Sequence, residues 1–370
     1  MEKFLMYFLF VVGIALIVKG GDWFVDGAVW LAEITKIPKF IIGATIISVA
    51  TTLPEIFVST LAAIEGHSIL VSGVENAAAL SQGKVGMAIG NGIGSVICNT
   101  AMILAISMVF MPIGIKRNDF APKAFLLFAA VAALFAFSFN GSLNVWGALV
   151  LLLIFALYIA ENVRSAKQDA IDRVKQNTQN AAANVNASAD AANANAAAIE
   201  NAPATDKKSI ILNVLRIVGG AAAIVLGSQL LVDNGSKIAL SWGVSEAIIG
   251  VTIVAIGTSL PELVTAITSI IKKQSSMSVG NVIGANVIDT TLILAICSFV
   301  YGGNLPVSAQ NVYLDFPVAV LVTLIAAVPA VIRKKFSRVQ GVLLLLIYAA
   351  YLVIITAGLN WYLGLFGVAV

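Results

Sequence analysis

Three acidic residues, Glu55, Glu262 and Asp289, lie within segments that are otherwise apolar. An ionised carboxylate in such surroundings is costly unless it is paired, hydrated, protonated or bound to a cation. Where two such acids face each other, their repulsion favours either a shared divalent cation or the protonation of one acid. A hard cation such as calcium takes about six to eight oxygen ligands, of which two glutamates supply up to about four. Other groups would have to supply the rest.

Glu55 and Glu262 each end a copy of the same motif. Residues 43–55 read GATIISVATTLPE, and residues 250–262 read GVTIVAIGTSLPE. Each residue of the second copy follows its counterpart by 207 positions. A repeat of this length within one chain indicates an internal duplication.

The proline before each glutamate predicts a break in its helix. Pro54 and Pro261 have no N–H, so the carbonyl groups four residues earlier, at Ala50 and Gly257, lose their helical partner. Irregular backbone inside a membrane is tolerated where it lines a site or a cavity. We therefore expect nearby oxygens to face a cation, namely the carbonyls of Thr51 and Thr258 and the hydroxyls of Thr52, Ser259 and Ser95.

A second repeated element follows each motif. Residues 90–100 read GNGIGSVICNT, and residues 280–290 read GNVIGANVIDT. Ser95 and Asn99 are four residues apart and share a helix face, as do their counterparts Ala285 and Asp289. The Asn99/Asp289 pair could add one more ligand, and the glycines allow neighbouring helices to approach closely.

Each feature also has a simpler interpretation. An isolated proline is usually only a kink, an isolated Ser or Thr usually bonds its own backbone, and a single buried glutamate is often structural. The recurrence of the whole motif favours a functional site. Asp26 and Asp233, also 207 positions apart, lie near helix ends and are expected to be structural. His67 is expected in a surface loop, and Lys19 is expected to extend its amine towards the membrane surface.

The elements that carry these residues are predicted to be membrane helices. Of 370 residues, 59% are hydrophobic and 11% charged, whereas about a quarter are charged in soluble domains. Apolar stretches close to the ~20 residues that cross a bilayer recur along the chain, which predicts an all-α integral membrane protein. The predicted spans lie near residues 4–32, 40–65, 85–110, 121–140, 143–163, 210–238, 244–271, 277–301, 312–332 and 338–358.

The basic residues predict how these ten spans are oriented. With the N-terminus outside, the inner loops collect 18 of the 22 Lys and Arg residues, as the positive-inside rule requires. Five spans in each half make the halves antiparallel, which is the inverted-repeat plan of secondary transporters. We expect a first repeat at residues 1–164, a low-complexity cytoplasmic linker at 165–209 and a second repeat at 210–370. Both termini are expected outside a plasma (inner) membrane.

The two repeated elements resemble the α-repeats of the cation/calcium exchanger superfamily, and specifically those of the sodium/calcium exchangers. The resemblance covers both transmembrane halves but not the linker. It implies ten helices in an inverted five-plus-five repeat, with cation sites between the second, third, seventh and eighth spans. It also implies that the long first and sixth spans form the moving unit.

The resemblance further implies roles for individual residues. Glu55 and Glu262 match the paired calcium-binding glutamates of that family. Ala285 stands where the family often has Ser, which removes one hydroxyl. The other matched positions are the carbonyl donors Thr51 and Thr258, the hydroxyls Thr52, Ser259 and Ser95 around sodium, the central pair Asn99 and Asp289, and the backbone positions Ser48 and Ala255 one turn earlier.

The expected function is therefore secondary antiport of calcium against sodium by alternating access. Calcium and sodium would be transported substrates rather than cofactors, and the bilayer would be the other partner, with no nucleic acid. The alternatives are calcium/proton exchange, potassium-dependent sodium/calcium exchange and, from a different class, a cation channel. No H-E-x-x-H or G-x-S-x-G motif is present, so enzymatic activity is not expected.

Overall fold

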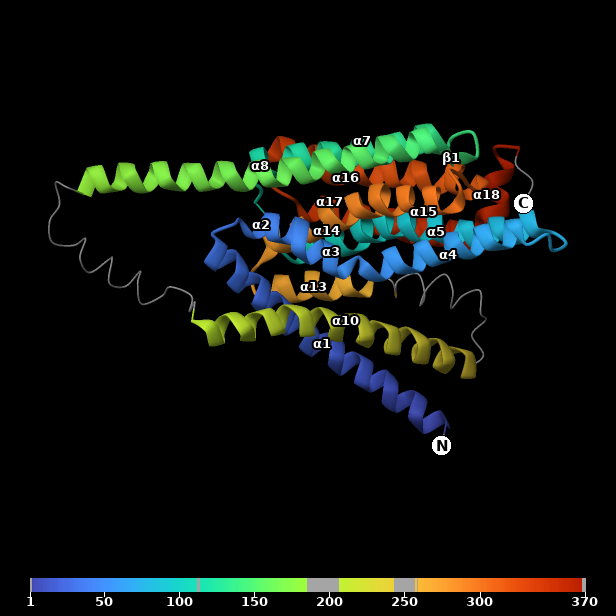
Figure 1. Ribbon diagram of the computed structural model, residues 1–370, viewed down its shortest axis with the longest axis horizontal. Coiled ribbons are helices and arrows are strands. Elements are labelled where there is room, and N and C mark those ends of the chain that lie inside the picture. Colours follow the sequence, from blue (N-terminus) through green and yellow to red (C-terminus); the bar gives the residue numbers. More distant parts are fainter. Residues whose placement is uncertain (1, 112–113, 185–205, 243–256, 258, 368–370) are drawn as a thin grey trace.

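The computed structural model describes residues 2–111, 114–184, 206–242, 257 and 259–367. The molecule is an elongated bundle of helices that run roughly along its long axis (Figure 1). Within the described residues, eight helices are long and apolar enough to cross a membrane, or nine if one bent pair counts as a single span. The span predicted near residues 244–271 falls largely outside the described residues, so the count of ten stays a prediction.

In the first half of the chain, helical breaks and wider π-helical turns (labelled η) interrupt two of the predicted spans. The elements are α1 (Glu2–Thr35), α2 (Lys39–Ile42), η1 (Gly43–Ile47), α3 (Ser48–Thr51), α4 (Leu53–Val71), α5 (Ala77–Cys98), η2 (Asn99–Leu104), α6 (Ala105–Phe110), α7 (Arg117–Ser138), β1 (Ser142–Asn144) and α8 (Val145–Asn184).

The second half has a similar order of elements. They are α10 (Lys207–Ser241), α13 (Leu260–Ile271), α14 (Ser275–Ile288), η4 (Asp289–Ile293), α15 (Leu294–Tyr301), β2 (Asn304–Pro306), η5 (Asn311–Asp315), α16 (Phe316–Arg333), α17 (Arg338–Val353), η6 (Ile354–Gly358) and α18 (Leu359–Gly364).

The long helix α8 continues well past the other helices at one end of the bundle (Figure 1). The sequence predicts that its span ends near residue 163 and that a linker begins at 165. The structure instead keeps residues 165–184 in the same helix, and α10 begins at Lys207.

Helices α1 and α10 pack along each other at one side of the bundle (Figure 1). Glycines set their close approach, because a Cβ added at Gly13 would lie 2.9 Å from the carbonyl oxygen of Gly227. A Cβ added at Gly20 would likewise lie 2.9 Å from the carbonyl oxygen of Gly220. Gly220 and Gly227 follow Gly13 and Gly20 by 207 positions. If each glycine of the first contact is exchanged for its counterpart in the other half, the second contact results.

Two short strand contacts also join the halves, at opposite ends of the bundle. β1 pairs antiparallel with β2, with Leu143 opposite Leu305. At the other end Gly114 forms an isolated antiparallel bridge with Lys335. Each contact joins the segment after the third predicted span of one half to the segment after the fourth predicted span of the other.

The centre of the bundle is formed by α5 with η2 and by α14 with η4. Every residue of α14 from Met277 to Ile288 is buried. Glycines again allow close contact: a Cβ added at Gly280 would lie 2.1 Å from the carbonyl oxygen of Phe40, and one at Gly284 would lie 2.4 Å from Ser48 Oγ. The helix that carries Asp289 is thus held directly against the segment before Glu55.

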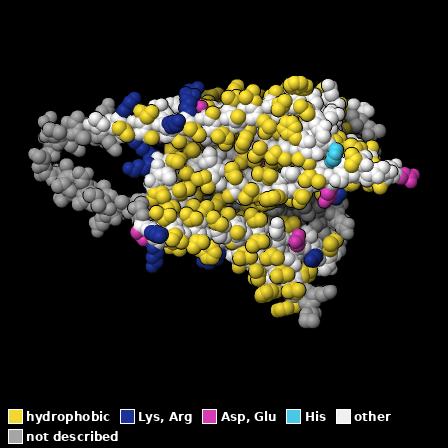
Figure 2. Space-filling model, viewed as in Figure 1, with side chains coloured by type: hydrophobic (Ala, Val, Ile, Leu, Met, Phe, Trp, Pro, Cys, Tyr) yellow, Lys and Arg dark blue, Asp and Glu magenta, His cyan; other side chains and the backbone are white. Residues whose placement is uncertain are grey.

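The surface separates into an apolar middle and a basic end. Figure 2 shows hydrophobic side chains over most of the visible face and Lys and Arg side chains concentrated at one end. Large apolar residues face outward, among them Phe125 at 67% exposed and Trp146 at 72% exposed. We call the "basic end" the end that contains residues 36–39, 114–117, 272–276 and 333–335, several of which line one pocket there. This surface is typical of a protein that crosses a bilayer.

The glycine contact between α1 and α10 predicts a specific cost for added volume. Gly220→Ala would place a methyl group 2.7 Å from the backbone nitrogen of Phe24, and overpacking of this kind costs about 1–3 kcal/mol. We expect a lower unfolding temperature in detergent. Gly219→Ala is the matched control, since no described atom lies within 4 Å of its added Cβ. Equal stability of the two variants would contradict the close packing.

Candidate cation site

Each proline–glutamate motif begins a new helix, as predicted. Thr52 and Ser259, the residues just before α4 and α13, have nearly the same backbone angles, with φ/ψ of −87°/0° and −88°/9°. Pro54 and Pro261 stand in the first turn that follows, where a missing N–H removes no helical bond. The helix axis bends by 45° at the first break. The predicted break is therefore confirmed at Thr52, and α13 begins after Ser259 with the same local geometry.

Both glutamates lie buried just after these breaks, and each is 1% exposed. The Thr52 hydroxyl donates to Glu262 Oε1 at 3.4 Å, so a side chain of the first motif meets the carboxylate of the second. Within the part of the chain that the structure describes, both carboxylate oxygens of Glu55 and Oε2 of Glu262 have no hydrogen-bond partner. Helix α4, which carries Glu55, packs against η4, which begins at Asp289.

Asn99 and Asp289 occupy equivalent places in the two halves. Each begins a π-helical turn, η2 and η4 respectively, and each is 1% exposed. Single π-helical turns within α-helices are frequent at functional sites. Counting only the described residues, both carboxylate oxygens of Asp289 and the amide oxygen of Asn99 are without a hydrogen-bond partner.

The predicted hydroxyl residues connect the two halves. Ser259 Oγ lies 3.5 Å from Ser95 Oγ, and Thr51 Oγ1 donates to Asn281 Oδ1 at 3.3 Å. Ser48 is buried one turn before the break, and its hydroxyl donates to the carbonyl of Thr45 at 3.0 Å. The nine predicted site residues that the structure describes are all buried, and hydrogen bonds join Thr52 to Glu262 and Ser259 to Ser95. Ala255 and Thr258 lie outside the described residues.

Six buried oxygens in this region have no hydrogen-bond partner among the described residues, namely both of Glu55, both of Asp289, Oε2 of Glu262 and Oδ1 of Asn99. A buried polar group left unpaired costs about 1–3 kcal/mol, and a charged one costs more. Cations or protons could provide the partners. Carboxylate, amide, hydroxyl and carbonyl oxygens together suit a hard cation such as calcium or sodium.

The carboxylates alone do not form a compact metal site. Among the described residues, no group of three His, Cys, Asp or Glu side chains could hold a metal ion. A cation bound between the two motifs would therefore take hydroxyl, amide or backbone oxygens in addition to carboxylates.

Two asparagines that the sequence analysis did not select support this site. Asn281 Nδ2 donates to Thr265 Oγ1 at 3.0 Å, while its oxygen accepts from Thr51. Asn91 Nδ2 donates to Ser59 Oγ at 2.9 Å and to the backbone carbonyl of Glu55 at 3.4 Å. Both asparagines follow the first glycine of the second repeated element, so the repeat itself contained the signal.

The structure also shows where the residues with other expected roles lie. Asp26 forms an ion pair with Lys272, and Asp233 is exposed on α10. The expectation that His67 lies in a surface loop is wrong. Helix α4 continues past it to Val71, and its Nδ1 lies 2.9 Å from the carbonyl oxygen of Tyr301.

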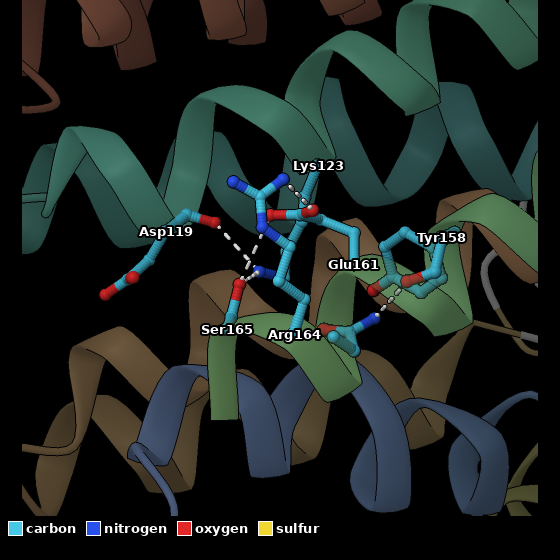
Figure 3. Close-up of polar contacts among 7 residues, drawn as sticks. Asp119, Lys123, Tyr158, Glu161, Arg164 and Ser165 are labelled. Carbon is cyan, nitrogen blue, oxygen red and sulfur yellow. Dashed lines mark hydrogen bonds and ion pairs between the residues drawn. The ribbon is translucent and has the colours of Figure 1, made fainter. Parts of the chain in front are cut away.

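A separate polar cluster lies between α7 and α8 near the basic end (Figure 3). The Lys123 ammonium is fully buried and donates to Ser165 Oγ at 2.9 Å and to the Asp119 carbonyl at 3.0 Å. One turn before Glu161 in α8, Tyr158 donates to the carbonyl of Ala44 at 2.8 Å. This cluster thus supports η1 from outside the cation site.

A helix break before Glu55, a matching helix start before Glu262 and buried carboxylates beside both, within a bundle of membrane-length helices, define a membrane protein with a candidate cation site inside its bundle. The family of sodium/calcium exchanger proteins matches residues 5–163 and 212–357. The chain belongs to this family, and it is a multi-pass membrane protein.

Individual relatives match over nearly the whole chain. An uncharacterized membrane protein of Methanocaldococcus jannaschii is 30% identical, covering 92% of this chain and 94% of its own length. The sodium/calcium exchanger MaX1 of Methanosarcina acetivorans is 26% identical, covering 94% and 98%. A solved structure of the sodium-calcium exchanger NCX_Mj matches with a TM-score of 0.72 at 26% identity, covering 94% of this chain and 98% of that one.

The position of Asn281 predicts that its loss affects both motifs. Asn281→Ala would remove the hydrogen bonds to Thr51 and Thr265, whose hydroxyls also bond backbone carbonyls, so we expect a loss of about 0.5–1.5 kcal/mol of stability for each bond. We also expect weaker calcium binding by isothermal titration calorimetry, since Thr265 lies one turn after Glu262. Asn118→Ala, on the exposed start of α7, is the control. Unchanged stability and affinity in Asn281→Ala would show that the asparagine does not support the site.

Proposed function

We propose that this protein is a secondary antiporter that exchanges calcium for sodium across the membrane by alternating access. The observation that carries the proposal is the meeting of two repeat-related helix starts around Glu55, Glu262 and Asp289, whose buried oxygens are largely without hydrogen-bond partners among the described residues. Family membership and the likeness to the sodium-calcium exchanger NCX_Mj support calcium and sodium as the ions.

In this proposal the two glutamates bind calcium from opposite halves of the chain. Thr51 and Thr258, with Ser48 and Ala255 one turn earlier, contribute backbone carbonyls. The hydroxyls of Thr52, Ser259 and Ser95 and the pair Asn99 and Asp289 complete the sodium sites. Sodium and calcium then compete for overlapping oxygens, so the carrier exchanges one for the other rather than binding both.

We further propose ten spans in an inverted five-plus-five repeat, with repeats at residues 1–164 and 210–370 joined by the linker at 165–209. The exchange of glycine contacts between α1 and α10 supports the two-fold relation, as do the strand contacts at opposite ends of the bundle. The basic end would face the cytoplasm, with both termini outside a plasma (inner) membrane.

Radioactive calcium uptake into liposomes tests the exchange reaction. Purified protein would be placed in sodium-loaded vesicles and diluted into sodium-free buffer, beside vesicles that hold only a proton gradient. We expect uptake driven by the sodium gradient. Uptake driven only by protons would instead assign calcium/proton exchange to the same carboxylates.

The glutamates predict which substitutions abolish this uptake. Glu55→Gln and Glu262→Gln each remove one negative charge at nearly constant shape, so we expect calcium uptake to fall by at least about 100-fold, because a buried charged contact is worth several kcal/mol. Glu75→Gln, in an exposed turn, is the matched control. Normal uptake by both site variants would exclude the proposed cation site.

The proposed orientation of the protein in the membrane can be tested without measuring ion transport. Ser72→Cys and Arg338→Cys place exposed thiols at opposite ends of the bundle, while Cys98 and Cys297 are buried. In intact cells, an impermeant maleimide is expected to label Ser72→Cys and to label Arg338→Cys only after permeabilisation. The reverse pattern would invert the proposed topology.

A further inference from the structure

A single lysine connects α1 to the end of α13 at the basic end. Lys272 Nζ lies 2.7 Å from Asp26 Oδ1 and 3.4 Å from Asp22 Oδ1, and it also donates to the Asp22 carbonyl at 2.9 Å. The Lys272 side chain is 23% exposed, so these contacts are partly shielded from water. We call these three residues, Lys272, Asp22 and Asp26, the clasp.

The helices beneath the clasp are in close contact. A Cβ added at Gly21 would lie 2.8 Å from Val264 Cγ1 and 2.9 Å from Thr268 Oγ1. Thr268 is only 8% exposed. Helix α1 thus covers the face of α13 that leads from the basic end towards Glu262.

The other half of the chain has no equivalent clasp at the corresponding place. The counterpart of Lys272, 207 positions earlier, is Glu65, which has the opposite charge. Glu65 pairs with Lys84 on α5 at 2.7 Å instead of reaching α10. The counterpart of Asp26 is Asp233, so a contact at this place would bring two acids together.

The corresponding surfaces of α4 and α13 also differ between the two halves. Phe57 and Leu61 on α4 are the counterparts of Val264 and Thr268 on α13. They are 64% and 56% exposed, although their counterparts are covered by α1.

The space between α10 and the two broken helices is correspondingly open. A cavity of about 120 Å³ there reaches Pro54 and Pro261, and residues Ser228, Gln229 and Asp233 of α10 also line it. Ser228 is 4% exposed, and its hydroxyl has no hydrogen-bond partner in the described part of the chain. Its counterpart is Gly21, which packs directly against α13.

We propose that Lys272 is a positioning residue that holds α1 against α13 and so closes the path to the cation site at the basic end. The inference rests on the proposed alternating-access antiport. Because the first repeat has Glu65 at the corresponding position, closure of the opposite end lacks this contact. The two end states of the cycle are therefore unequal, and the state closed at the basic end is favoured.

Thiol labelling tests this inference without reference to the transported ion. Thr268→Cys places a thiol under α1, and an impermeant maleimide is added to the basic face of sealed vesicles. Breaking the clasp with Lys272→Gln is expected to raise the labelling rate about three- to tenfold, as the loss of partly exposed ion pairs would. Ser269→Cys, which is 1% exposed on the same turn, serves if Thr268→Cys does not fold.

Matched variants separate the clasp from general destabilisation. Lys272→Arg keeps the cation and should label at nearly the parent rate, and so should Lys273→Gln, which changes the exposed neighbouring lysine. The charge swap Asp26→Lys with Lys272→Asp should restore slow labelling. An unchanged rate in Lys272→Gln, or an equal increase in Lys273→Gln, would overturn the inference.

Transport gives a second readout. Lys272→Gln is expected to raise the apparent KM for calcium offered at the opposite face about three- to tenfold, because fewer molecules face that side. A fall in the maximal rate with unchanged KM would point to a merely structural lysine and would contradict the inference. If no variant, including the parent, transports calcium, the antiport proposal fails while the labelling result still decides the role of Lys272.

Discussion

The structure depends on the cost of placing carboxylates inside an apolar bundle. Glu55, Glu262 and Asp289 are almost completely buried, and most of their oxygens have no hydrogen-bond partner among the residues that the structure describes. Burying such groups is unfavourable unless a charge of opposite sign or a proton accompanies them. Among the described residues these acids form no ion pair with Lys, Arg or His, and their hydrogen-bonding neighbours are neutral oxygens, which would leave the counter-charge to a mobile ion. If a buried lysine provided the counter-charge permanently, the protein could not exchange it for another cation.

Close helix contact makes this arrangement geometrically possible. Gly280 and Gly284 bring α14 against the backbone at Phe40 and Ala44, so the helix that ends at Asp289 touches the segment that leads to Glu55. Threonine hydroxyls of the first half also donate hydrogen bonds to the second half, from Thr52 to Glu262 and from Thr51 to Asn281. Each half therefore contributes to the environment of the other, and neither half contains a complete site.

The sequence predicted those features that the duplication repeats. The helix break at Thr52, the start of α13 after Ser259 and the burial of the acids follow from motifs that occur twice. The features it did not predict depend on contacts between distant residues or on helix length. Lys272 pairs with Asp22 and Asp26 about 250 positions earlier, and nothing local to Lys272 indicates that partner. Helix α4 extends past His67, and α8 extends past residue 164, because polar residues there continue a helix that apolar periodicity alone would end.

The glycine contact between α1 and α10 has a consequence for biosynthesis. The face of α1 that contains Gly13 and Gly20 is complementary to a helix whose matching glycines lie 207 positions further along the chain. At translation rates of about 5–20 residues per second, that partner emerges roughly 10–40 s later. During this interval the first helix resides in the membrane with its small-residue face against lipid or an insertion factor. Assembly of the carrier is therefore completed late, when α10 of the second half is inserted and covers the glycine face of α1.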